Sequence, residues 1–179
     1  GVEQNITKTF AVHLTQAPAI VMKQNNGTIF RQRIFKDRIE DVKPGLAEDN
    51  ALLAATSDTQ VNFNGKLFTA SQLDEDITGF AGMTIQHMQL DAMAQKWYIH
   101  TTDGLWVANF DGSNIVLIDS AATGAMYADT NRNRLYWATN NGLYSMPLVK
   151  SKNNQFTSKA TQYNTLNDIV LIAVDNNLR

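Results

Sequence analysis

The chain has 179 residues, of which 44% are hydrophobic and 18% are charged, and it contains no cysteine. This composition is ordinary for a globular protein, and the lack of cysteine excludes disulfides, thiolate metal sites and cysteine nucleophiles. The formal net charge of −2 argues against a nucleic-acid-binding protein, because such a surface needs concentrated Lys and Arg. The densest basic group, residues 31–38, is interrupted by apolar and acidic positions.

Four short turns, each ending in glycine, recur along the chain. They are Asn26-Gly27, Asn64-Gly65, Asp103-Gly104 and Asn141-Gly142, and successive glycines are 38, 39 and 38 residues apart. Asn-Gly and Asp-Gly favour hairpin turns of type I′, in which both central residues have positive φ. Four such turns at a nearly constant interval indicate an internal repeat.

Strand-like segments rich in aromatic and β-branched residues flank every turn. In chain order the hairpins are AIVMKQ–TIFRQRI, TQVNF–KLFTA, KWYIHT–LWVANF and RLYWAT–LYSMPL. The third copy predicts four strands, at residues 82–90, 96–101, 104–110 and 114–119. By contrast, the segment 41–55 is predicted to be a loop, because Pro44 and Gly45 interrupt it.

Short antiparallel strands repeated at this interval predict an all-β fold, a β-propeller built from four-stranded blades of about 38 residues. A sandwich or barrel built from the same strands is the alternative. The chain holds about four and a half repeats, so residues 1–179 are expected to form a single β-propeller or a propeller fragment. The units are predicted at 5–42, 50–80, 82–119 and 121–160, with the start of a fifth at 168–179.

The fourth copy carries a family resemblance. Tyr136-Trp137-Ala138-Thr139 resembles the YWTD motif of low-density-lipoprotein-receptor class B repeats, which form six-bladed propellers. Further segments resemble the family's third strand with its turn (107–114) and the residues upstream of the motif (88–91, 126–129 and 172–175). The resemblance covers about residues 82–148 and 168–179.

The repeats depart from the family pattern at one position. The Asp that ends the motif is replaced by Thr101 and Thr139, so its structural hydrogen bonds are not carried over. Such degenerate repeats are similar to those of bacterial exported proteins, which implies a soluble, extracellular or periplasmic protein. No apolar run approaches the roughly 20 residues of a membrane helix, so no membrane insertion is expected within this chain.

The number of units leaves three arrangements open. The chain can be part of a larger propeller, its final strand can close the ring by joining the first unit, or two chains can complete one another. Open blade edges expose unpaired backbone groups, so self-association through them is expected if the ring is not closed.

The sequence offers little chemistry for a channel site. It has no GxSxG, P-loop, GxGxxG or HExxH motif, and no cofactor is predicted. His13 and His87 fall on expected innermost strands and are the weak candidates for a metal site, although neither has a second ligand at metal spacing. Residues 129–133 begin like a calcium loop, but Arg134 replaces the required Gly, so a polar turn is predicted. The innermost strands, expected at 50–56, 82–90, 124–128 and 168–174, are largely apolar, which argues against a propeller enzyme.

Aromatic residues recur at equivalent positions beside the hairpins and are expected to pack between blades. They are Trp97, Tyr98, Trp106, Tyr136, Trp137 and Tyr144.

Binding is expected where the x-Gly turns share a face with the loops between blades, here 35–50 and 149–168. The candidate binding residues are Asp103, Asn141, Phe156 and Tyr163. The predicted function is a non-catalytic interaction module of an exported protein that binds a protein or carbohydrate partner, with sensing or oligomerisation as further roles. The alternative is a propeller-type hydrolase or lyase with a metal in the central channel.

Overall fold

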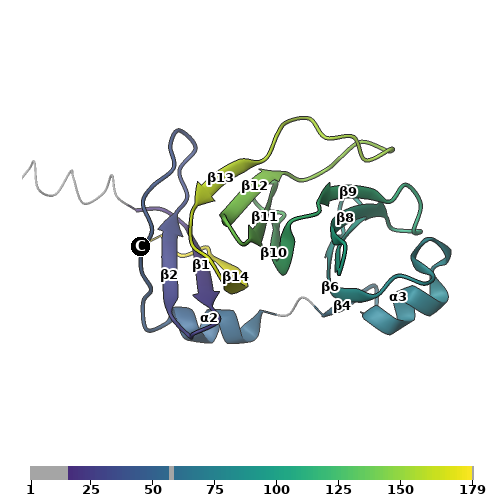
Figure 1. Ribbon diagram of the computed structural model, residues 1–179, viewed down its shortest axis with the longest axis horizontal. Coiled ribbons are helices and arrows are strands. Elements are labelled where there is room, and N and C mark those ends of the chain that lie inside the picture. Colours follow the sequence, from purple (N-terminus) through teal and green to yellow (C-terminus); the bar gives the residue numbers. More distant parts are fainter. Residues whose placement is uncertain (1–15, 57–58, 179) are drawn as a thin grey trace, which may run out of the picture.

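The computed structural model describes residues 16–56 and 59–178, and the regular secondary structure of this part is mainly short antiparallel strands (Figure 1). These strands make three four-stranded sheets and one two-stranded sheet. The innermost strands of the three larger sheets lie side by side, with the inner strand of the middle sheet contacting those on both sides. This is the arrangement of consecutive propeller blades, and it confirms the predicted fold class.

Two of the four-stranded sheets are continuous in sequence. The distal sheet contains β6 (Ile85–Asp91), β7 (Lys96–Thr101), β8 (Gly104–Asn109) and β9 (Val116–Asp119). The middle sheet contains β10 (Ala122–Asp129), β11 (Arg134–Thr139), β12 (Gly142–Pro147) and β13 (Thr161–Asn164). The four strands predicted for the third copy lie within a few residues of the observed ones.

The remaining four-stranded sheet, the composite sheet, joins the two ends of the described chain. Its order is β14 (Ile169–Asp175), β1 (Ala19–Gln24), β2 (Ile29–Arg33) and β3 (Lys43–Pro44). In the antiparallel pair of β1 and β14, Ile20 lies opposite Val174 and Met22 lies opposite Ile172. The final strand joins the first unit, as in one of the arrangements left open by the sequence, and closure of the ring is not seen among the described residues.

The second unit departs from the predicted pattern of four strands. Its described part has one hairpin, β4 (Gln60–Phe63) and β5 (Lys66–Thr69), followed by α3 (Ala70–Asp76) and the 3₁₀ helix η1 (Thr78–Phe80). A capping box starts α3, in which the Thr69 hydroxyl accepts from the Gln72 amide and the Gln72 side chain accepts from the Thr69 amide. This pair satisfies two backbone donors and favours a helix where the fourth strand of the unit was expected.

Two predictions for residues 41–56 are wrong. The predicted loop at 41–55 and the predicted innermost strand at 50–56 overlap a helix, α2 (Asp49–Ala55). Pro44 and Gly45 lie before this helix and do not interrupt it. The Asp49 carboxylate accepts a hydrogen bond from the Leu46 amide at its start, and the Ala- and Leu-rich sequence that follows has high helix propensity.

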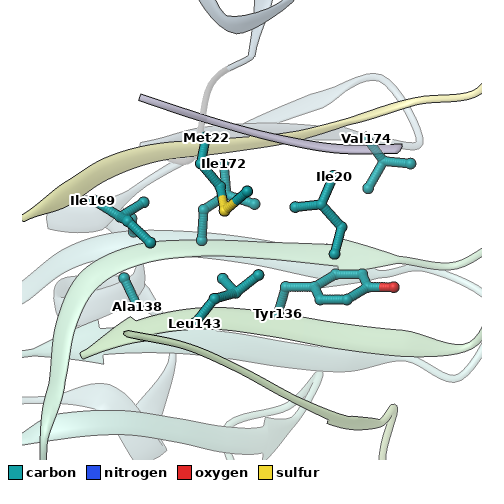
Figure 2. Packing of buried hydrophobic residues seen from close by; sticks show 9 residues of the cluster. Ile20, Met22, Tyr136, Ala138, Leu143, Ile169, Ile172 and Val174 are labelled. Carbon is teal, nitrogen blue, oxygen red and sulfur yellow. The ribbon is translucent and has the colours of Figure 1, made fainter. Parts of the chain in front are cut away.

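Hydrophobic side chains fill the spaces between successive sheets. Between the composite and middle sheets, Ile20, Ile172 and Val174 pack against Tyr136 and Leu143 (Figure 2). A second cluster joins the middle and distal sheets, and a third joins the distal sheet to the β4–β5 hairpin and α3. Among the repeated aromatics, Trp97, Tyr98, Tyr136 and Trp137 are fully buried, whereas Trp106 and Tyr144 are half-buried.

Each of the three blades also has a buried aspartate at the end of its innermost strand. Asp91, Asp129 and Asp175 pair with Lys150, Arg132 and Arg31, respectively. Each of these carboxylates also accepts a backbone N–H from the turn or chain end that follows its strand. The aspartates that carried the family resemblance therefore tie the end of each inner strand to a neighbouring segment.

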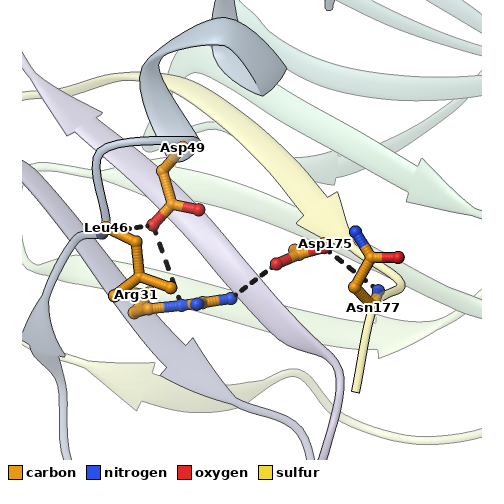
Figure 3. Close-up of polar contacts among 5 residues, drawn as sticks. All are labelled: Arg31, Leu46, Asp49, Asp175 and Asn177. Atoms are coloured by element: carbon orange, nitrogen blue, oxygen red, sulfur yellow. Dashed lines mark hydrogen bonds and ion pairs between the residues drawn. The ribbon is translucent and has the colours of Figure 1, made fainter. Parts of the chain in front are cut away.

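The pair in the composite sheet is the most enclosed of the three. Arg31 of β2 donates to Asp175 of β14 at 2.8 Å, and its Nε lies 3.7 Å from Asp49 of α2 (Figure 3). All three side chains are at most 10% exposed. Arg31 thus connects the first hairpin to α2 and to β14.

Within the described ranges, no helix is sufficiently long and apolar to span a membrane.

Candidate binding site between two blades

The predicted turn residues Asp103 and Asn141 are exposed and occupy equivalent places on adjacent sheets. Asp103 lies in the β7–β8 turn and Asn141 in the β11–β12 turn, and each donates its amide to a threonine hydroxyl two residues earlier, at 3.2 and 3.0 Å. The threonines are Thr101 and Thr139, which replace the motif's aspartate. A hydroxyl oxygen therefore accepts the turn N–H at the position where the family has a carboxylate.

The backbone of these turns differs from the type I′ prediction. Positive φ at both central positions occurs at Asn64-Gly65, where φ is 51° and 76°. Asp103 and Asn141 are not in this region, and only the glycines after them are, with φ of 134°. At Gly142 a Cβ would overlap the Asn164 carbonyl, so the glycine is also required for close approach of β13.

The segment 149–168 is not the inter-blade loop that was expected. It contains β13, the fourth strand of the middle sheet, and the residues before β13 connect it to β12. This connection reaches over the distal sheet, where Lys96 Nζ donates to the Ser151 carbonyl at 2.8 Å and Asn154 Nδ2 donates to the Asn114 carbonyl at 2.6 Å. These contacts are at the β6–β7 turn end, opposite the x-Gly turns.

Phe156 is consequently separated from the x-Gly turns, whereas Tyr163 lies beside the Asn141-Gly142 turn, where the neighbouring Gln162 side chain donates to the Asn141 carbonyl at 2.9 Å. Phe156 belongs to the β12–β13 connection and is 42% exposed. Tyr163 lies on β13 and is half-buried against the composite sheet. The structure does not gather the four predicted residues into one site, and their role in binding stays a prediction.

A cleft of about 950 Å³ lies between the composite and middle sheets, and we name it the inter-sheet cleft. One wall is the segment 34–39, which follows β2, and the other is the β10–β11 turn together with β11 and β13. Its lining residues are Pro18, Ile34, Phe35, Lys36, Asp37, Arg38, Ile39, Asn131, Arg132, Asn133, Arg134, Tyr136, Thr161 and Tyr163. Tyr163 is the one predicted binding residue among them.

Two tyrosines form the inner part of the cleft. The rings of Tyr136 and Tyr163 meet edge to face, with centroids 5.7 Å apart. Tyr136 is fully buried, and its hydroxyl has no hydrogen-bond partner in the described part of the chain. Burial raises the pKa of Tyr136, so this hydroxyl is a neutral donor at physiological pH.

The charged residues of the cleft differ in how well they are neutralised. Arg38 pairs with Asp37 and Glu40 and lies over the Phe35 ring, 3.8 Å from its centroid. Arg132 pairs with Asp129. Arg134 donates to the Ser145 hydroxyl at 3.0 Å.

Two cations of the cleft are left without an acidic partner. Within residues 16–56 and 59–178, neither Lys36 nor Arg134 forms an ion pair. The inter-sheet cleft is therefore locally positive although the whole chain has a net charge of −2.

Hydrogen bonds across the base of the cleft hold its two walls together. Gln32 of β2 donates to the Tyr163 carbonyl at 2.7 Å and to the Glu40 carbonyl at 2.8 Å. Asn164 of β13 donates to the Gln32 side chain at 2.9 Å. Gln32 is buried, so these bonds are shielded from water and fix the relative position of the walls.

Most of the residues that line this cleft carry no sequence signal for binding. Apolar and acidic residues interrupt the basic group at 31–38, so its sequence does not indicate a continuous basic surface. Those interruptions, Ile34, Phe35 and Asp37, line the cleft beside the cations. The polar turn predicted at 129–133 is confirmed at residues 130–133. The signal that this turn faces the first unit was the possible joining of the last strand to the first unit.

Of the two histidine candidates for a metal site, the structure describes His87. His13 lies outside the described residues. The ring of His87 lies 5.7 Å from that of His100 on the neighbouring strand, and His100 Nε2 is 3.2 Å from the Ala122 carbonyl. In the described ranges no group of three or more His, Cys, Asp or Glu residues is placed to hold a metal ion.

Comparisons with known proteins find similarity to solved structures and not to curated sequences. No protein-family model matches the chain, and no curated protein matches it. A chain in the crystal structure of a nidogen/laminin complex is similar at 13% sequence identity, with a TM-score of 0.35. The match covers 73% of this chain and 58% of that chain, so it spans less than two thirds of the other protein's length.

Proposed function

We propose that this chain is a non-catalytic interaction module and that a partner protein binds in the inter-sheet cleft. The observation that carries the proposal is the cleft itself, which has exposed apolar and cationic side chains around a buried hydroxyl that no described residue hydrogen-bonds. Residues 1–179 then form one propeller, or a piece of a larger one, in an exported protein that works outside the cytoplasm.

The structure of the walls supports binding without large rearrangement. The Gln32 hydrogen bonds and the apolar cluster behind Tyr136 hold the composite and middle sheets together. A rigid cleft loses little conformational entropy when it is occupied, which favours affinity. In the wall formed by the segment 34–39, the side chains of Ile39 (48% exposed) and Lys36 are exposed. These two side chains can change rotamer to contact a partner.

A partner protein fits the cleft better than a carbohydrate does. Apolar side chains, including Pro18, Ile34 and Ile39, lie beside the cations. Apolar anchors next to a few charges are typical of protein interfaces. A cleft of about 950 Å³ is also at the upper end of the range for small-molecule pockets, which suits an extended segment of several residues.

The test is to probe arrays of random extended peptides and of oligosaccharides with the wild-type chain and with two blocked variants. Thr161→Trp places a large ring in the cleft, and Thr102→Trp places the same ring at the β7–β8 turn on the opposite end of the sheets. We expect peptide binding that Thr161→Trp abolishes and Thr102→Trp retains. Loss of binding with Thr102→Trp alone would move the site to the x-Gly turns, and oligosaccharide binding alone would contradict a protein partner.

A further inference from the structure

We propose that the inter-sheet cleft recognises an acidic peptide segment, and that one carboxylate of the peptide is bound between the Tyr136 hydroxyl and the Arg134 guanidinium. This inference rests on the proposed function, which requires only that the cleft binds a partner protein. It adds the chemical class of the segment and the two residues that select it.

The first argument is the position of the two anchoring side chains. Arg134 and Tyr136 are two residues apart on β11, so their side chains project from the same face of the sheet. Both line the inter-sheet cleft. In Figure 2 the Tyr136 hydroxyl points away from Ala138 and Leu143, at the outer end of the apolar cluster.

The second argument is the unused hydrogen bond of Tyr136. Its hydroxyl is buried and makes no hydrogen bond within the described residues. Buried polar groups in folded proteins nearly always have a partner, because leaving one unsatisfied costs its hydration. A ligand oxygen at this point would accept the hydrogen bond that the protein does not.

The third argument is charge. Lys36 and Arg134 line the cleft without an acidic partner among the described residues, whereas Arg38 and Arg132 are neutralised by Asp37, Glu40 and Asp129. Two unneutralised cations beside a neutral hydroxyl donor select an anionic oxygen over a neutral one. A carboxylate can accept from Arg134 and Tyr136 together, and such charge-assisted bonds are stronger than neutral ones.

The rest of the lining favours a peptide as the source of the carboxylate. A free carboxylate would fill a small part of the cleft, whose remaining surface includes Ile34, Ile39 and the Tyr163 ring. A side chain next to the acidic residue can pack on these groups. A sulfated glycan needs a longer run of unneutralised cations than Lys36 and Arg134 provide.

The experiment uses a defined probe and an NMR readout. The probe is an N-acetylated, C-amidated peptide, Gly-Ser-Glu-Phe-Glu-Ser-Gly, and its control has Gln in place of both Glu residues. Each is titrated into the ¹⁵N-labelled chain while backbone chemical shifts are followed. We expect the acidic peptide to shift resonances of residues 34–39, 131–134 and 161–163, and the Gln peptide to bind at least about tenfold more weakly.

Three variants assign the contacts. Arg134→Gln and Tyr136→Phe are each expected to weaken binding of the acidic peptide about fivefold to tenfold. Lys152→Gln removes an exposed lysine that does not line the cleft and is expected to leave binding unchanged. Tyr136→Phe is also expected to keep or raise the melting temperature, because the hydroxyl has no described protein partner to lose. A lower melting temperature would indicate a structural role instead.

The outcomes separate this inference from the proposed function. Equal binding of the acidic and Gln peptides would overturn carboxylate recognition but leave the cleft as a peptide site. Shifts in the cleft with a heparin fragment and none with the peptide would overturn both. If N-acetylglutamate amide shifts the cleft resonances as much as the acidic peptide does, the cleft recognises the carboxylate alone. That result would overturn recognition of a peptide segment. If no probe shifts the cleft resonances, this inference fails, and the array experiment with Thr161→Trp still decides the proposed function.

Discussion

In the β7–β8 and β11–β12 turns, one threonine hydroxyl accepts a backbone N–H of the turn. Thr101 Oγ1 accepts hydrogen bonds from the Asp103 amide and from the Trp106 indole at 3.2 and 3.0 Å. The sequence placed Thr101 at the position of the motif's aspartate but gave no reason to expect the same bonds. A hydroxyl can accept both, because the turn brings the two donors to one oxygen.

Replacing Thr101 with Val is therefore expected to destabilise the protein by about 1–2 kcal/mol, since two donors lose their acceptor in a buried position. Urea denaturation measures the change in the free energy of unfolding. Thr102→Val, at the exposed neighbouring position, is the matched control and should have little effect. Similar losses for both variants would contradict a specific role for the Thr101 hydroxyl.

Tyr136 gives a prediction for alkaline pH. Burial raises the pKa of Tyr136 in the folded state above the value of about 10 for an exposed tyrosine. Above pH 10 the unfolded chain releases a proton that the folded chain retains, so stability falls as pH rises, by at most about 1.4 kcal/mol per pH unit for this residue. Below pH 10 the residue contributes no pH dependence.

Unfolding curves of the wild type and Tyr136→Phe between pH 8 and pH 11.5 test this prediction. The variant should lose stability less steeply above pH 10 than the wild type, and the two slopes should agree below it. Equal slopes over the whole range would mean that Tyr136 ionises in the folded protein as readily as in the unfolded chain.

At the scale of single elements, the glycines after the turns are fixed by the strands that pack on them. A Cβ on Gly142 would overlap the carbonyl of Asn164 on β13, and a Cβ on Gly104 would lie 2.5 Å from the Asp119 carbonyl on β9. Gly65 also has positive φ, but a Cβ there would meet no atom within 4 Å. The same motif thus has different requirements in a four-stranded blade and in the two-stranded hairpin.

Gly142→Ala is expected to cost about 3 kcal/mol or more and to weaken the pairing of β12 with β13, because the backbone must move to admit the methyl group. Gly65→Ala carries only the cost of a left-handed backbone, about 1–2 kcal/mol. Thermal unfolding followed by circular dichroism compares the two. A larger loss for Gly65→Ala would contradict the described contact between Gly142 and β13.

Buried and exposed arginines with two acidic neighbours allow a matched comparison. Arg31 lies between Asp49 and Asp175 and is 10% exposed, whereas Arg38 lies between Asp37 and Glu40 and is 48% exposed. Arg31→Met leaves two buried carboxylates without their cation, and about 3–5 kcal/mol of stability should be lost. Arg38→Met should cause no measurable loss, because water solvates its partners. Chemical denaturation at pH 7 measures both, and equal effects would show that Arg31 does not hold the composite sheet together.

Local sequence signals predicted the regular blades well and the irregular segments poorly. β6 to β9 follow from alternating, aromatic-rich segments and short turns, which need no information from distant residues. The helices α2 and α3 were missed because a propeller repeat was extended across them, although the Thr69–Gln72 capping box was present in the sequence. The β12–β13 connection was misplaced because its position depends on contacts with Lys96 and Asn114 of another sheet.

The candidate site was predicted less completely than the fold. Tyr163 was predicted as a binding residue from the composition of the segment 149–168. Its place in the cleft depends on the pairing of β14 with β1. That pairing brings the β2 segment against the middle sheet, so residues about 100 positions apart, such as Phe35 and Arg134, line one cavity. The period of the repeat cannot indicate which two units become neighbours at the ends of the chain.

For the whole molecule, the decisive feature is the composite sheet, in which the last strand is the innermost strand of the first blade. It places the composite sheet beside the middle sheet, creates the apolar cluster of Figure 2 and forms one wall of the inter-sheet cleft. If β14 came from a second chain, the same sheet would form between molecules, and the protein would be an exchanged dimer.

The most direct test is an NMR measurement of contacts between β1 and β14 on a mixture of isotope-labelled and unlabelled chains. The structure predicts backbone NOEs between Val21 and Ala173, and side-chain NOEs between Met22 and Ile172, all within one molecule. Absence of these NOEs, or their appearance only between labelled and unlabelled chains, would contradict a first blade completed by the chain's own final strand.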